Sequence, residues 1–352
     1  MNSARLSHWP ALSGALLALT AAGLFGASTP LVQRFGSGVG PLTTAALLYA
    51  GAALAGLLLR RRVEREAQLS RVDIPRLLAM AAAGAVVGPV ALAWGLQRTS
   101  GTSASLMLAL EALFTAVLAW FFYRETIGRR VWLAMCMLVF GGVALILDQS
   151  RGGGAGMLGL LAVLVATAAW GLDNTLSRAL AERDPGQVVL AKALLGAAVT
   201  ILLAVAFAEP FPPLVAAVAL SAIGVTGYGL SLRFYLLAQR AFGAARTGSV
   251  FAFAPFIGAA LAVAMGGQAV SWLLALGGAL MLAGIVLHLT ETHRHEHAHE
   301  AMEHEHAHVH DDSHHDHAHD PMPEGSHSHV HRHDPRHHAH PHVPDAHHTH
   351  PH

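Results

Sequence analysis

Charged residues are scarce in this sequence, and lysine and cysteine are almost missing. Charged residues make up 12% of the 352 residues and hydrophobic residues 53%, which is far from the composition of a soluble globular protein. Lys192 is the only lysine, and Cys136 is the only cysteine, so the chain has no internal disulfide. It also has no glycine-rich phosphate loop ending in Lys-Ser or Lys-Thr, which excludes an ATP-driven pump made of this chain alone.

No helix of the chain carries a nucleophile–base pair or a metal-ligand spacing, so we expect no enzymatic activity and no required cofactor. The few charges are also unevenly placed. Of the 26 histidines, 24 follow Leu289, and so do 12 of the 22 acidic residues. The sequence therefore divides into a strongly apolar body and a histidine-rich tail. This division predicts a polytopic membrane protein with the lipid bilayer as a partner and without a nucleic-acid partner.

The apolar body contains ten runs that are long enough to cross a bilayer, for which about 20 residues are needed. Helix is the expected state, because a spanning helix satisfies its backbone groups internally and the alternation of a membrane barrel is absent. We therefore predict an all-α integral membrane protein. The expected spans are residues 11–33, 40–59, 75–97, 102–123, 130–148, 156–180, 187–208, 213–238, 245–266 and 270–290.

Arginines predict the orientation of these spans. Fourteen arginines, including Arg5, lie at the amino end or in the loops after even-numbered spans, whereas the opposite loops hold only Arg34, Arg98 and Arg151. Basic loops stay on the cytoplasmic side. Both termini are therefore predicted to be cytoplasmic, in an inner or plasma membrane.

The body reads as two related halves, residues 1–149 and 150–290, which are followed by a tail at 291–352. When Leu108 is aligned with Phe251, alanine and leucine recur at matching positions downstream. Each half has five spans, so the two copies must have opposite orientations. Inverted repeats are common in secondary transporters, which place the solute site between the repeats. The sequence therefore predicts a five-plus-five inverted repeat.

Two local motifs carry a resemblance to a known family. Phe25-Gly26-Ala-Ser28-Thr29 in the first span matches Trp170-Gly171-Leu-Asp173-Asn174 in the sixth, and the fourth span of each half is rich in small residues. This pattern resembles the EamA-type transporters of the drug/metabolite transporter superfamily. The usual proline of the fourth span is present as Pro255 but replaced by Ala112 in the first half. The resemblance implies a transporter fold and leaves the solute open.

Ionisable residues inside the spans are the first candidates for the solute or coupling-ion site, because they are costly in a bilayer. They are Glu111, Asp173, Lys192 and Arg233. Asn174 extends the polar stretch at Asp173, and Lys192 on the next span is the expected partner of Asp173. An alternative interpretation is that the four charges form two structural ion pairs.

Deeper aromatic residues and prolines form a second group. Trp170 and Tyr228 are candidates for stacking on an organic solute, although core packing is the simpler interpretation. Pro30, Pro89 and Pro255 lie inside apolar spans, where a missing N–H favours a kink. We interpret these three prolines as hinge candidates.

The tail has almost no apolar residues and is therefore predicted to be disordered. Its imidazoles suit Zn, Ni and similar divalent ions, with a buffering or sensing role and adventitious binding both open. The expected ligands are His293, His295, His297, His299, His304, His306, His308, His310, His314, His315, His317 and His319.

Two functions compete. The spans favour a secondary-active exporter or permease of a small organic metabolite or drug, with a metal-binding regulatory tail. The tail favours a divalent transition-metal (Ni/Co/Zn) transporter or metal-tolerance protein instead. The spans argue against metal as cargo, because His288 is their only histidine and lies at a span end. A homodimer, the coupling ion and the direction of transport stay open from the sequence.

Overall fold

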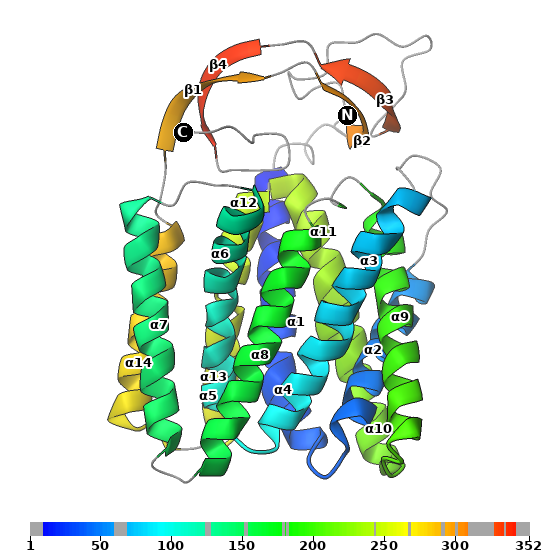
Figure 1. Ribbon diagram of the computed structural model, residues 1–352, viewed down its shortest axis with the longest axis vertical. Coiled ribbons are helices and arrows are strands. Elements are labelled where there is room, and N and C mark those ends of the chain that lie inside the picture. Colours follow the sequence, from blue (N-terminus) through cyan, green and yellow to red (C-terminus); the bar gives the residue numbers. More distant parts are fainter. Residues whose placement is uncertain are drawn as a thin grey trace, which may run out of the picture.

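The computed structural model covers the whole chain and describes residues 10–59, 69–123, 128–150, 154–177, 180, 183–242, 244–266 and 269–289, together with four strands in the tail. Within these residues, ten helical segments are long and apolar enough to cross a membrane. The predicted all-α fold of ten spans is confirmed, and each observed span overlaps its predicted range. The spans lie roughly along the long axis of the molecule (Figure 1).

The first half has the following elements. Its single-helix spans are α1 (Pro10–Phe35), α2 (Pro41–Leu58) and α7 (Arg129–Ser150). The third span is composite, with η1 (Arg71–Asp73), α3 (Ile74–Met80), η2 (Ala81–Val87) and α4 (Gly88–Leu96). The fourth span is also composite, with α5 (Gly101–Met107), η3 (Leu108–Leu110) and α6 (Glu111–Tyr123).

The second half repeats this layout. Its single-helix spans are α8 (Gly154–Ser177), α9 (Pro185–Ala206) and α14 (Trp272–Leu289). The eighth span consists of α10 (Leu214–Ile223), η5 (Gly224–Leu230) and α11 (Ser231–Phe242). The ninth consists of α12 (Ala244–Phe251) and α13 (Ala254–Ala264). Thus the third and eighth spans each contain a π-helical turn, η2 and η5, and the fourth and ninth are each interrupted.

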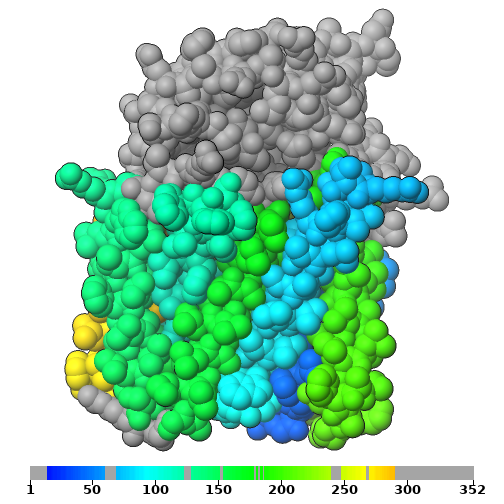
Figure 2. Space-filling view, viewed as in Figure 1, coloured from blue at the N-terminus to red at the C-terminus, as the bar shows by residue number. Residues whose placement is uncertain are grey.

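The two halves pack on each other through equivalent helices. α7 packs on α14, and α2 packs on α9. Glycines allow the first contact: a Cβ on Gly141 would lie 2.9 Å from the Gly277 carbonyl oxygen, and one on Gly284 would lie 3.0 Å from the Ala134 carbonyl oxygen. Such close backbone approach is how small residues stabilise helix pairs in lipid. Figure 2 shows neighbouring spans meeting along the face formed by α7, α8, α3 and α9.

Two of the three proline hinge candidates lie at interruptions of their spans. Pro89 is the second residue of α4, which begins where η2 ends, and Pro255 lies in the first turn of α13, after the break that follows Phe251. Pro30 lies within the continuous helix α1. Whether any of the three acts as a hinge stays a prediction.

The structure describes the tail only as the backbone of four strands. These are β1 (His293–His299), β2 (Met302–His308), β3 (His327–His333) and β4 (Arg336–His342). β1 pairs with β4 and β2 with β3, both antiparallel. These segments are extended where disorder was predicted. Their His-x-His spacing has the period of two that suits a strand. The prediction of disorder rested on the scarcity of apolar residues and did not consider this spacing. The rest of the tail lies outside the described residues.

Candidate functional site

A buried ion pair lies at the centre of the candidate site. Asp173 on α8 and Lys192 on α9 form a salt bridge through Asp173 Oδ2, and their residues are only 6% and 7% exposed. Lys192 is therefore the partner that the sequence predicted. The second oxygen of Asp173, Oδ1, makes no hydrogen bond within the described part of the chain. Burying two charges costs desolvation free energy, and removing either partner would leave the other charge buried without compensation.

Gly84 in η2 makes room for this pair. A Cβ at position 84 would overlap the carboxylate of Asp173. The carbonyl oxygen of Gly84 is also free of its usual helical partner, because the N–H of Gly88 bonds to Ala83 in the π-helical turn and Pro89 has no N–H. A buried carbonyl needs a donor.

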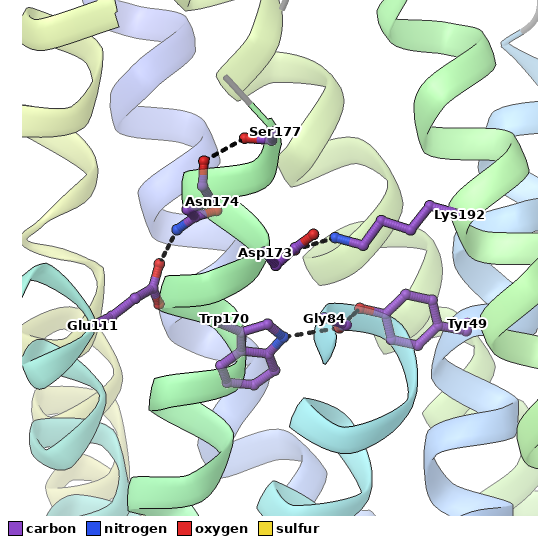
Figure 3. Close-up of polar contacts among 8 residues, drawn as sticks. All are labelled: Tyr49, Gly84, Glu111, Trp170, Asp173, Asn174, Ser177 and Lys192. Carbon is purple, nitrogen blue, oxygen red and sulfur yellow. Dashed lines mark hydrogen bonds and ion pairs between the residues drawn. The ribbon is translucent and has the colours of Figure 1, made fainter. Parts of the chain in front are cut away.

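Two aromatic side chains supply that donor. The Tyr49 hydroxyl and the Trp170 indole Nε1 both donate to the Gly84 carbonyl oxygen, the latter at 3.0 Å. Figure 3 shows both side chains converging on Gly84, beside the pair of Asp173 and Lys192. The π-helical turn therefore ties α2 and α8 to the third span at the ion pair.

Glu111 lies on the other side of α8, at the start of α6. Its carboxylate oxygen Oε1 accepts a hydrogen bond from Nδ2 of Asn174 (Figure 3). Ser177 donates to the Asn174 carbonyl oxygen at 2.8 Å, one turn further along α8. Glu111 is half-buried and Asn174 is exposed, in contrast to the buried pair beside them. The contact joins the first half to the second, and it is the more accessible part of the polar site.

Aromatic rings from both halves pack around Phe25, in the motif of the first span. Its ring centroid lies 5.9 Å from Trp170, 6.0 Å from Tyr228 and 5.4 Å from Phe251. Tyr228 also contacts Tyr49, with 5.6 Å between the centroids. Edge-to-face geometry dominates these contacts, as expected for stable aromatic packing. Tyr228 and Trp170 are therefore parts of one aromatic cluster beside the polar site.

Arg233 is not part of this arrangement. Its Nη1 lies 3.4 Å from the carbonyl oxygen of Leu59, near the end of α2. Of the two structural ion pairs in the alternative interpretation, the structure contains the one between Asp173 and Lys192. Glu111 instead accepts a hydrogen bond from an amide, and Arg233 donates to a carbonyl. Sequence reasoning missed Tyr49, which looks like an ordinary core residue, and it named Phe25 only as part of the repeat motif. Gly84 and Gly227 are separated by the same number of residues as Leu108 and Phe251, so the alignment of the two halves could have drawn attention to Gly84.

The predicted metal ligands cannot be placed in a site. The side chains of all twelve tail histidines lie outside the described residues, as do the backbones of His310, His314, His315, His317 and His319. Among the side chains that are described, no group of three or more His, Cys, Asp or Glu residues is arranged to hold a metal ion.

Comparison with known proteins identifies the family. The family model of the EamA-like transporter family matches residues 12–147 and again residues 157–290. An uncharacterised transporter of Methanothermobacter thermautotrophicus is 27% identical over 295 residues, which cover 78% of this chain and 86% of that protein.

One solved crystal structure, whose description states no function, supports the fold. It has a TM-score of 0.55 at 20% sequence identity, with 78% of this chain and 95% of that chain covered. Together with the two family matches, which take up most of the helical body, this establishes that the chain is a multi-pass membrane protein and belongs to the EamA-like transporter family.

Proposed function

We propose that this transporter moves a small organic metabolite or drug by secondary-active transport, with Glu111, beside the buried pair of Asp173 and Lys192, binding the solute or a coupling proton. The observation that carries the proposal is the bond between Glu111 of the first half and Asn174 of the second. A half-buried carboxylate inside a span is tolerated beside water, a solute or a partner. Within the described residues, the hydrogen-bond partner of Glu111 is the neutral amide of Asn174.

The two carboxylates have different roles in this proposal. Asp173 is buried and held by Lys192, so the pair links α8 to α9 beside η2, on which both helices pack, and supports the adjoining aromatic cluster. Glu111 is reachable and can exchange Asn174 for a solute group or a proton. Transport would then proceed by alternating exposure of the site between the repeats, with both termini in the cytoplasm as the arginines indicate.

The test compares the metabolites and metals of cells with and without the gene, and repeats the comparison with Glu111→Gln. Glu111→Gln is expected to abolish the solute difference while protein abundance stays normal. Asp148→Asn is the matched control, because its amide can still accept the hydrogen bond that Ser271 donates to Asp148. Loss of abundance together with transport in Glu111→Gln, but not in the control, would point to a structural carboxylate instead.

For the tail we infer that it binds Zn or Ni ions and modulates transport. The strand register supports this inference, because it sets His295 opposite His340 and His306 opposite His329. Residues directly opposite in antiparallel strands lie on one face, with Cβ atoms about 4.5–5.5 Å apart. Metal as cargo is the second candidate. It requires that the metal content of cells, and not the level of a metabolite, differs between cells with and without the gene. It also requires that deletion of the tail removes this difference.

A further inference from the structure

The two strand pairs of the tail share one register. β1 pairs with β4 and β2 pairs with β3, both antiparallel. At the end of the first pair His299 lies opposite Arg336, and at the start of the second Met302 lies opposite His333. Each strand of the second pair thus begins three residues on from the first, so one register continues through both. The first histidine block of the tail therefore pairs with the last block.

Histidine occupies opposite positions on one face of each strand pair. Residues two apart in a strand lie on the same face. In each sheet, three positions on that face have histidine on both strands. The pairs are His293–His342, His295–His340 and His297–His338 in the first sheet, and His304–His331, His306–His329 and His308–His327 in the second.

The positions between these pairs have another composition. They belong to the opposite face of each sheet, because neighbouring residues of a strand point to opposite sides. None of them is histidine. They are Arg294–Pro341 and Glu296–Ala339 in the first sheet, and Glu305–Val330 and Ala307–Ser328 in the second. Histidine is therefore concentrated on one face of each sheet, where the register places it in three successive pairs.

The spacing of the pairs matches the needs of a divalent ion. Opposite residues have Cβ atoms about 4.5–5.5 Å apart, and the next pair on the same face follows about 7 Å along the strand. A closed Zn²⁺ site takes four ligands in a tetrahedron, and imidazole is a suitable ligand. One pair supplies two ligands and two neighbouring pairs supply four. Any two neighbouring pairs include the central one, which is His295–His340 in the first sheet and His306–His329 in the second.

We propose that each sheet of the tail holds one divalent transition-metal ion, with Zn²⁺ the best match, on four histidines: the central pair and one neighbouring pair. This proposal rests on the proposed metal-binding tail and assigns its ligands. The assigned ligands include histidines of β3 and β4, which the sequence did not single out. They do not include five that the sequence did, namely His310, His314, His315, His317 and His319.

The first sheet lies close in sequence to the transporter body. β1 begins at His293, shortly after α14 ends at Leu289. An ion held by β1 and β4 therefore keeps the chain around His340 beside the segment that leaves the last span. Metal binding orders that segment, which gives the proposed modulation of transport a physical route.

The test measures Zn²⁺ bound to the full-length protein by equilibrium dialysis. The unchanged chain is expected to bind about two Zn²⁺ tightly, one for each sheet. The double variant His295→Ala with His340→Ala removes one central pair and should weaken one ion only. The expected loss of affinity is about 10-fold to 100-fold or more, because loss of even an outer-shell partner costs that much. His295→Ala with His329→Ala also removes two histidines, but one from each central pair, and should weaken both ions.

The control variant removes two histidines outside the proposed ligands. His314→Ala with His317→Ala should leave the binding of both ions unchanged. It matches the other double variants in the number of histidines removed, so it separates the effect of position from the effect of histidine content.

A second measurement tests the register without metal. Cys136 is the only cysteine, so Cys136→Ala gives a background without thiols. In it, His295→Cys with His340→Cys should form a disulfide under diamide, because Cα atoms of opposite residues lie about 4.5–5.5 Å apart, within the range of disulfides. His295→Cys with His329→Cys should stay reduced. Loss of labelling by a maleimide–polyethylene glycol reagent reports the disulfide as a gel shift.

Equal loss of Zn²⁺ in the matched and mismatched double variants would overturn the proposal, and so would an equal loss in His314→Ala with His317→Ala. Disulfide formation by the mismatched cysteines as readily as by the matched ones would overturn the register on which it rests. A full-length protein that binds no more Zn²⁺ than one truncated after Thr290 would reject metal binding by the tail altogether. That last result is a failure of the proposed function, and it is distinct from a wrong ligand set.

Discussion

Removing Lys192 should destabilise the protein more than removing both members of its ion pair. Lys192→Met keeps the length and apolar stem of the side chain but leaves Asp173 without a counter-charge. Asp173 Oδ1 already has no hydrogen bond in the described structure, so the whole carboxylate would then be unpaired. The residue is 6% exposed, which leaves water little access to it.

The size of the effect follows from this burial. Breaking a buried pair by removing one partner costs about 3–5 kcal/mol of the free energy of unfolding. Asp173→Asn should cost less, because an amide is neutral and can accept one hydrogen bond from Lys192. In the double variant no charge stays buried. The two single effects should therefore exceed the double effect by roughly 2–3 kcal/mol, the upper range for residues in contact.

Equilibrium unfolding in mixed micelles with increasing SDS, followed by the fluorescence of the six tryptophans, measures these free energies. The four proteins form a complete double-mutant cycle. Additive effects of the two substitutions would refute the reasoning, because they would mean that water or another group already compensates Asp173. A double variant less stable than Lys192→Met would refute it as well.

Four other predictions concern packing, topology and the tail. Gly84→Ala should lower the free energy of unfolding by roughly 1–3 kcal/mol because its Cβ overlaps the Asp173 carboxylate, whereas Gly23→Ala should change it little in the same unfolding assay. Reporter fusions should read outside the cell after Asp148 and inside after Thr290, and any other pattern breaks the predicted orientation. Truncation after Thr290 should leave an inserted, transporting protein that binds less Zn or Ni in equilibrium dialysis, and loss of all transport together with metal-dependent growth of full-length cells would make metal the cargo. Metal affinity of the full chain should fall below about pH 6.5, because imidazole must be neutral to bind.

The sequence was sufficient for the spans and for the buried pair. Ten apolar runs of membrane-spanning length leave helix as the state that satisfies the backbone, and all ten were found. Asp173 and Lys192 could be paired because charge is so rare in the body that each had few candidate partners. The same scarcity led to Glu111, although the sequence did not indicate that Asn174 would be its contact.

The aromatic framework of the site could not be read in the same way. Tyr49 donates to the Gly84 carbonyl oxygen only because the π-helical turn and Pro89 together remove the donor that a regular helix would provide. Helix periodicity does not show where a π-helical turn falls. Pro89 was recognised as a possible kink, but its consequence lies five residues earlier, at a carbonyl group.

The two halves are alike in packing and unlike in polar chemistry. Glycines recur at equivalent positions, as with Gly84 and Gly227 or Gly141 and Gly284. In contrast, Asp173 corresponds to Ser28 in the repeat motif, and Glu111 corresponds to Ala254.

An inverted repeat can exchange its two states only if the packing surfaces of the halves remain interchangeable, which explains why the glycines recur. A solute is bound once, by groups from both halves, so its ligands need no symmetric copies. Glu111, a carboxylate that lacks a counterpart, is therefore where solute recognition is expected, and the packing glycines that have one, such as Gly84 and Gly227, are where the movement is expected.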